Sequence, residues 1–141
     1  MNWDDLNSEK SYEPRVAYNQ SKLCNILFTR ELAERLRGTK VTAVSLHPGV
    51  VRTELGRYFA DSYGWKAYVF QVLFLPIIYW WFKSSKQGAQ TSLHCAIEED
   101  VDAHSGSYYF DCQVKALLPH ALNDDDARRL WELSEKLTKL K

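Results

Sequence analysis

The sequence predicts an α/β fold with a parallel sheet, because helix and strand patterns alternate along the chain. Residues 16–36 and 86–98 carry apolar side chains at helical spacing. Residues 41–46 are β-branched and apolar, and residues 106–110 are rich in aromatic side chains, both typical of strands. Two strands are fewer than a doubly wound sheet needs.

Local signals support each predicted helix. The first helix is expected to end near Gly38, because a glycine readily takes the left-handed conformation that closes a helix. A last helix is expected after Asn123, which caps it, with acidic residues 124–126 in its first turn. The predicted buried sides are Leu23, Ile26, Leu27, Ala33 and Leu36 in the first helix, Ala89, Leu93, Ala96 and Ile97 in the second, and Ala127, Leu130, Trp131 and Leu137 in the last.

Composition limits the classes of protein that the chain can belong to. Its 141 residues, 45% of them hydrophobic, suffice for one domain or part of one. The 18 basic residues balance the 18 acidic ones, which argues against a nucleic acid partner. Cys24, Cys95 and Cys112 are widely spaced without a C-x-x-C pair, so we expect free thiols in a reducing compartment and no metal site.

One segment, Ala67 to Phe82, is almost wholly apolar. It falls short of the roughly 20 residues that span a bilayer. Gln71 and Pro76 interrupt it. We interpret it as a segment that lies on a membrane surface or lines an apolar pocket, with a spanning helix as the less favoured alternative.

The glycines do not form a phosphate-binding turn. None of the six approaches the G-x-x-x-G-x-G or G-x-G-x-x-G spacing with which a first strand and helix hold a dinucleotide. Either the fold is of another kind, or its nucleotide-binding first half is absent.

Tyr18 and Lys22 are one helical turn apart, so their polar ends can meet on one face. The hydroxyl of a free tyrosine has a pKa of about 10. A tyrosine that acts as an acid or base near neutral pH therefore needs a neighbouring positive charge that favours the phenolate form. The spacing alone is weak evidence, because Tyr79 and Lys83 repeat it. We interpret that second pair as an interfacial aromatic residue with a lysine that extends its charged end to water.

Context distinguishes the first pair. Tyr18-x-x-Ser21-Lys22 opens the first helix, and the strand after that helix runs into Pro48-Gly49-Val50-Val51-Arg52-Thr53. This ordered set resembles the short-chain dehydrogenase/reductase family. Four segments are similar to its retinol dehydrogenase branch: DLNSEK at 5–10, SKLCNILFTREL at 21–32, HPGVVRTEL at 47–55 and GAQT at 88–91. The likeness covers nearly the whole chain and is weakest over residues 56–82.

The resemblance implies catalytic roles for two residues. Tyr18 would exchange a proton with the alcohol or carbonyl oxygen while hydride moves to or from the nicotinamide. Lys22 would favour the phenolate form and hold the nicotinamide ribose.

The resemblance also implies a cofactor site. The main chain at Val51 would bind the carboxamide, and Thr53 would contact that group or the nearby phosphate. Pro48 and Gly49 would shape the turn that lets the main chain approach. The implied cofactor is NADP, with NAD as the alternative, because the residues that choose between them lie in the absent half.

The implied fold is the C-terminal part of a Rossmann-type doubly wound parallel sheet, with residues 1–141 as one portion of a single domain. The N-terminal nucleotide-binding strands and the catalytic serine would lie before Met1, so we expect the chain alone to be inactive. The implied substrate is apolar, such as a retinoid.

The run from Ala67 to Phe82 would form a lid over that substrate or rest on the endoplasmic reticulum membrane. The alternative function is a non-enzymatic membrane-surface or interaction protein derived from a dehydrogenase fold. A fragment that stands alone in this way would be cytoplasmic.

Overall fold

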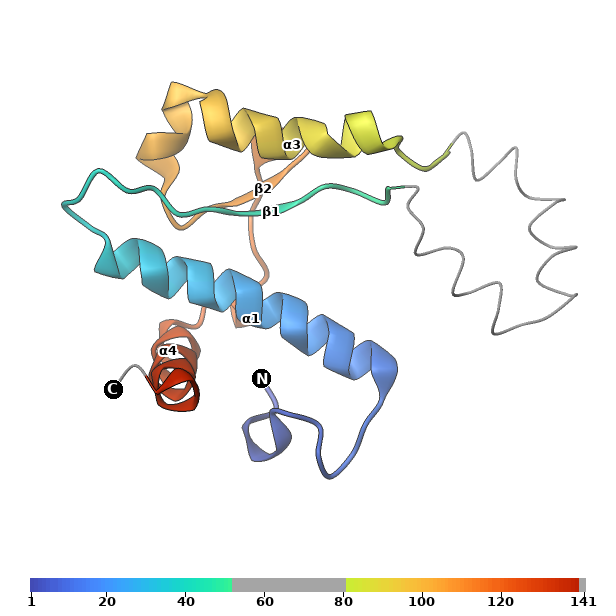
Figure 1. Ribbon diagram of the computed structural model, residues 1–141, viewed down its shortest axis with the longest axis vertical. Coiled ribbons are helices and arrows are strands. Elements are labelled where there is room, and N and C mark those ends of the chain that lie inside the picture. The colour runs from blue at the N-terminus through green and yellow to red at the C-terminus, as the bar shows by residue number, and fades with distance from the viewer. Residues whose placement is uncertain (52–80, 140–141) are drawn as a thin grey trace, which may run out of the picture. The chain divides into compact units, whose positions relative to one another are not determined.

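The computed structural model describes residues 1–51 and 81–139. Its elements are η1 (Trp3–Asp5), α1 (Pro14–Arg35), β1 (Ser45–His47), α3 (Ser85–Ile97), η2 (Glu99–His104), β2 (Tyr108–Phe110), β3 (Gln113–Val114), η3 (Pro119–Ala121) and α4 (Asp124–Thr138), as Figure 1 shows. The strands form a sheet in the order β1-β2-β3. The expectation of mixed helix and sheet is therefore confirmed for the described residues.

The chain divides into two compact units, and the division falls within each of the three strands and between α3 and η2. The first unit contains residues 1–45, 98–109 and 114–141. The second contains residues 46–97 and 110–113.

Helix α1 of the first unit begins at a capping carboxylate. The Glu13 side chain accepts hydrogen bonds from the main-chain N–H groups of Arg15 and Val16, at 3.2 and 2.7 Å. Pro14 follows it, where its fixed φ suits a helix start and its missing N–H costs nothing. Beyond the other end, Gly38 has a φ of +84°, so the predicted left-handed closure is confirmed.

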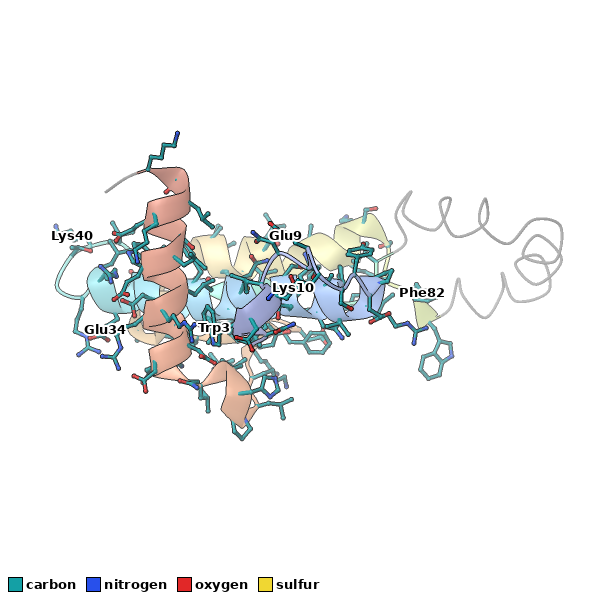
Figure 2. The ribbon with its side chains drawn as sticks, turned by 90° about the horizontal axis from the view of Figure 1, so that it is seen from below. Trp3, Glu9, Lys10, Glu34, Lys40 and Phe82 are labelled. Carbon is teal, nitrogen blue, oxygen red and sulfur yellow. The ribbon has the colours of Figure 1, made fainter. Side chains whose placement is uncertain are left out.

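Helices α1 and α4 pack against each other around Leu27, which is fully buried. Ala127 and Leu130 of α4 complete this core, as predicted. At its edge the rings of Phe28 and Trp131 stack with their centres 4.9 Å apart. In Figure 2, α4 (red) runs across α1 (blue). Burial of apolar side chains between these helices is the main stabilising term of the first unit.

The N-terminal segment joins the same core through Trp3, which Figure 2 labels. Its indole N–H donates to Asp126 Oδ1 at 2.8 Å. The Arg129 guanidinium lies 4.3 Å from the centre of the Trp3 indole. No local sequence pattern predicts this attachment, because it joins residues at the two ends of the chain.

The start of α4 is as predicted. The Asn123 side chain accepts from the N–H groups of Asp125 and Asp126, both at 3.1 Å. The predicted stripe is wrong at Leu137, which is 64% exposed. Helix α4 is longer than the core it covers, so its last turn extends past the contact with α1.

The predicted strand 41–46 is wrong in its bounds, since β1 spans Ser45–His47. The N–H of Ala43 donates to the Ser105 hydroxyl at 3.2 Å, so a side chain takes the place of a neighbouring strand. The Ala43 carbonyl does accept from the Gly106 N–H at 2.7 Å. This stretch is therefore held in an extended form without a continuous ladder.

A short hairpin that the sequence analysis missed follows β2. Strands β2 and β3 are joined by Asp111 and Cys112, which both have positive φ, 52° and 58°. Two central residues of this kind are typical of the tight turn that joins antiparallel strands. The sheet is thus mixed, and the expected wholly parallel sheet is corrected. The turn lacks the Asn-Gly or Asp-Gly pair by which such turns are usually recognised.

In the second unit, α3 (Ser85–Ile97) confirms the predicted helix within a residue at each end. Its predicted buried side is wrong, because Leu93 and Ile97 are 51% and 74% exposed. The buried residues are Gly88 and Thr91. The side chain of Val51 packs on Gly88, where a Cβ would come within 2.5 Å of it, and so fixes which face of α3 is covered.

Among the residues described, no helix has the length and apolar character needed to cross a bilayer. The run from Ala67 to Phe82 lies outside the described residues except for its last two, Trp81 and Phe82.

We predict that Gly88→Ala destabilises the second unit. An added Cβ would meet the Val51 Cγ2 at 2.5 Å. The overpacking should cost about 1–3 kcal/mol, against a gain of about 1 kcal/mol in helix propensity. Urea denaturation followed by circular dichroism measures the net loss.

Val51→Ala removes the clashing methyl groups, so the double variant Gly88→Ala/Val51→Ala should recover part of that loss. A Gly88→Ala chain more stable than the parent would contradict the contact.

Candidate active site

Tyr18 and Lys22 lie in the first half of α1 in the first unit. The Lys22 Nζ is 5.2 Å from the centre of the Tyr18 ring. The Tyr18 side chain is 61% exposed, so a substrate and cofactor can reach its hydroxyl. Tyr18 and Lys22 therefore lie on one helix face, and their catalytic roles remain predictions.

The residues between them serve the helix and the N-terminal segment. The Ser21 hydroxyl donates to the Tyr18 carbonyl at 2.7 Å. The Gln20 side chain donates to the Leu6 carbonyl and accepts from the Asn2 N–H, both at 2.9 Å. These bonds tie residues 2–6 to α1, on which Tyr18 stands. The sequence analysis assigned no role to Gln20.

The bend after β1 belongs to the second unit. Gly49 has a φ of +85°, which favours glycine, and its N–H donates to His47 Nδ1 at 2.8 Å. Val51 forms a parallel bridge with Lys83, whose N–H donates to the Val50 carbonyl at 2.9 Å. Thr53 lies outside the described residues.

Lys83 has a different environment from the one predicted. Its ammonium forms an ion pair with Asp111 and lies 5.5 Å from the centre of the Phe110 ring. The interpretation of Lys83 as an interfacial lysine that reaches for water is therefore corrected. Tyr79, its predicted companion, lies outside the described residues. Sequence spacing gave no signal for a pair 28 residues apart.

His47 is the last residue of β1. Its ring lies 5.6 Å from that of Phe110, tilted by 54°. It accepts a hydrogen bond through Nδ1 from Gly49, so it shapes the bend.

Burial raises the pKa of the Cys24 and Cys95 thiols. Both therefore stay protonated at neutral pH. The three cysteines are free. Within residues 1–51 and 81–139, no group of three or more His, Cys, Asp or Glu side chains could hold a metal ion.

A wide hollow of about 1230 Å³ lies elsewhere in the first unit. It is lined by the C-terminal half of α1, the turn after it and residues from 102 to 128, and Tyr18 and Lys22 do not line it. In Figure 2, Glu34 and Lys40 mark the end of α1 at this hollow. Its lining includes charged side chains such as Arg30, Glu34 and Asp102, which do not suit an apolar substrate.

The two groups of residues fit a nicotinamide cofactor chemically. Tyr18 and Lys22 supply exposed O–H and N–H donors of the kind that a ribose diol requires. The bend supplies main-chain N–H and C=O groups next to Gly49 and to Val50, which is 60% exposed.

Comparison with known proteins gives close relatives. Retinol dehydrogenase 14 of Homo sapiens is 46% identical over 140 residues, which make up 99% of this chain and 40% of that protein. Retinol dehydrogenase 12 of Homo sapiens is 47% identical over 134 residues, 94% of this chain and 39% of that protein. Retinol dehydrogenase 11 of Homo sapiens is 42% identical over 134 residues, 95% of this chain and 40% of that protein.

No protein-family model matches the chain. The chain spans about 40% of the length of the curated relatives that it matches. Identity at this level over nearly the whole chain establishes common descent and a common fold. The chain therefore belongs to the same family as these retinol dehydrogenases, the short-chain dehydrogenases/reductases, and matches the C-terminal part of these longer proteins.

Proposed function

We propose that this chain supplies the catalytic tyrosine and lysine of an oxidoreductase that moves hydride between NADP and an apolar alcohol or aldehyde. The observation that carries the proposal is the exposed Tyr18 with the Lys22 ammonium 5.2 Å from its ring centre. Its relatives are named retinol dehydrogenases, so a retinoid is the proposed substrate.

In this proposal, Tyr18 gives a proton to the carbonyl oxygen during reduction and takes it back from the alcohol during oxidation. The Lys22 ammonium favours the phenolate form of Tyr18 and donates to the ribose hydroxyls. A bound nicotinamide supplies the hydride transfer itself. Tyr18 and Lys22 therefore handle the proton and the orientation of the cofactor.

The bend completes the proposed cofactor site. The main chain at Val51 holds the carboxamide, Thr53 contacts the carboxamide or phosphate, and Pro48 and Gly49 set the turn. NADP is proposed over NAD on the resemblance alone.

We further propose that the 141-residue chain is inactive by itself. It contains no glycine-rich phosphate loop, and the resemblance places the serine that orients the substrate oxygen before Met1. The proposed location of the whole enzyme is the endoplasmic reticulum membrane, through the run Ala67 to Phe82.

A second candidate, a non-enzymatic protein that binds membrane surfaces, is favoured by Trp81. This described end of the apolar run is 79% exposed. Tryptophan prefers the boundary between lipid and water, because its ring is apolar and its N–H is polar.

The purified 141-residue chain should not oxidise NADPH in the presence of retinal, because it cannot hold the pyrophosphate or orient the substrate. Absorbance at the nicotinamide band measures the rate. Turnover above that of a matched Tyr18→Phe chain would refute the inactivity.

A chimera should be active. In it, this chain replaces the aligned 140 residues of human retinol dehydrogenase 14. Tyr18→Phe in the chimera should lower kcat by about 10²–10⁴-fold, because the proton donor is lost. Tyr12→Phe is the matched control, since Tyr12 is also exposed, at 72%, and has no proposed role. Equal activity of the two variants would overturn the role of Tyr18.

Phosphatidylcholine vesicles test the second candidate. The chain should sediment with them if the apolar run contacts lipid, and Trp80→Ser/Trp81→Ser should reduce the bound fraction. Leu137→Ser is the control, because Leu137 is an exposed apolar residue outside the run. Equal loss in both variants would mean that the binding is not specific to the run.

A further inference from the structure

The bend that carries Val51 is held by a closed set of contacts, which we call the Lys83 cluster: His47, Gly49, Lys83, Phe110 and Asp111. All five residues belong to the second unit. The family resemblance pointed to the bend and gave no role to Lys83 or Asp111. The contacts of these two residues show what holds the bend in place.

The side chain of Lys83, which we call its stem up to the ammonium, packs on Gly49 of the bend. A Cβ on Gly49 would lie 3.0 Å from the Cδ, Cε and Nζ atoms of Lys83. The space that Gly49 leaves free is thus occupied by Lys83. Gly49 is required here both by its φ of +85° and by this contact.

The main chain of Lys83 holds the next residue of the bend. Its N–H donates to the Val50 carbonyl at 2.9 Å, and the residue bridges Val51. Side chain and main chain of one lysine therefore contact three successive residues, 49 to 51.

The charged end of Lys83 is fixed in turn. The Asp111 carboxylate pairs with the ammonium, and the face of Phe110 lies 5.5 Å from it. Phe110 also packs on His47, whose Nδ1 accepts from the Gly49 N–H. Phe110 and His47 therefore connect the Lys83–Asp111 ion pair to Gly49 of the bend.

Asp111 is held in place by an unusual turn. Asp111 and Cys112 have φ of 52° and 58°, a conformation that costs residues other than glycine free energy. The Cys112 N–H donates to Thr91 Oγ1 on α3 at 3.4 Å, which helps to retain the turn.

We propose that Lys83, held by Asp111, is a positioning residue that fixes the bend at 48–51 for the nicotinamide. This proposal rests on the proposed function of the bend. Lys83 contacts neither substrate nor cofactor in it, and acts through the main chain of Val50 and Val51. Loss of the ion pair frees the lysine stem and loosens the bend.

The first test uses hydrogen exchange by NMR on the whole 141-residue chain. Lys83→Met keeps the stem over Gly49 and removes the charge, and Asp111→Asn keeps a residue that tolerates positive φ. Each variant should lower the protection of the Gly49 and residue 83 amides from exchange by about two- to fivefold. The expected effect is small because the ion pair is partly exposed.

The double variant should lose no more protection than either single variant, because the two residues act as one pair. Lys83→Arg should retain the protection. Lys86→Met, a lysine of α3 outside the cluster, is the control and should leave it unchanged. If only the aliphatic part of the Lys83 side chain held the bend, Lys83→Met would show the same amide protection as the parent. That result would overturn the proposal.

The second test uses the chimera. Lys83→Met should raise the KM for NADPH about fivefold and change kcat less than about twofold, because cofactor positioning is weakened and the proton donor is intact. Lys83→Arg should restore the KM. An unchanged KM with lowered protection would overturn the positioning role. A chimera inactive with Lys83 in place would count against the proposed function alone, and exchange would then decide the role of the ion pair.

Discussion

The helical spacing of Tyr18 and Lys22 is the constraint on which the proposed function depends. The four-residue spacing places the Lys22 ammonium 5.2 Å from the centre of the Tyr18 ring, and Tyr18 stays exposed. The spacing acts only while α1 is a rigid helix at this point. The Glu13 cap before it and the Leu27 contact with α4 after it provide that rigidity.

The two units are stabilised by different physical means. In the first, apolar burial around Leu27 supports the helix, and polar contacts of Gln20 and Trp3 attach the N-terminal segment. Among the described residues of the second, the buried positions of α3 are Gly88 and Thr91, and the bend is held by contacts of Lys83 with Gly49 and Asp111. A partly exposed ion pair is weak alone, but here it also fixes a stem that packs on glycine.

Sequence reasoning located the local features well. The cap at Asn123, the left-handed Gly38 and the existence of three helices follow from short-range chemistry and are present. It failed where distant segments decide the outcome. Leu93 and Ile97 match a buried pattern but are exposed, because Val51 packs on Gly88 and turns that face of α3 inward.

The sequence by itself determined the family, the helix that carries Tyr18 and Lys22, and the glycine of the bend, because each depends on residues near one another in the chain. Only the tertiary structure decided the partner of Lys83, the attachment of Trp3 to α4 and the hairpin at Asp111. These are contacts between segments whose meeting depends on chain folding, and no spacing of residues along the chain encodes them.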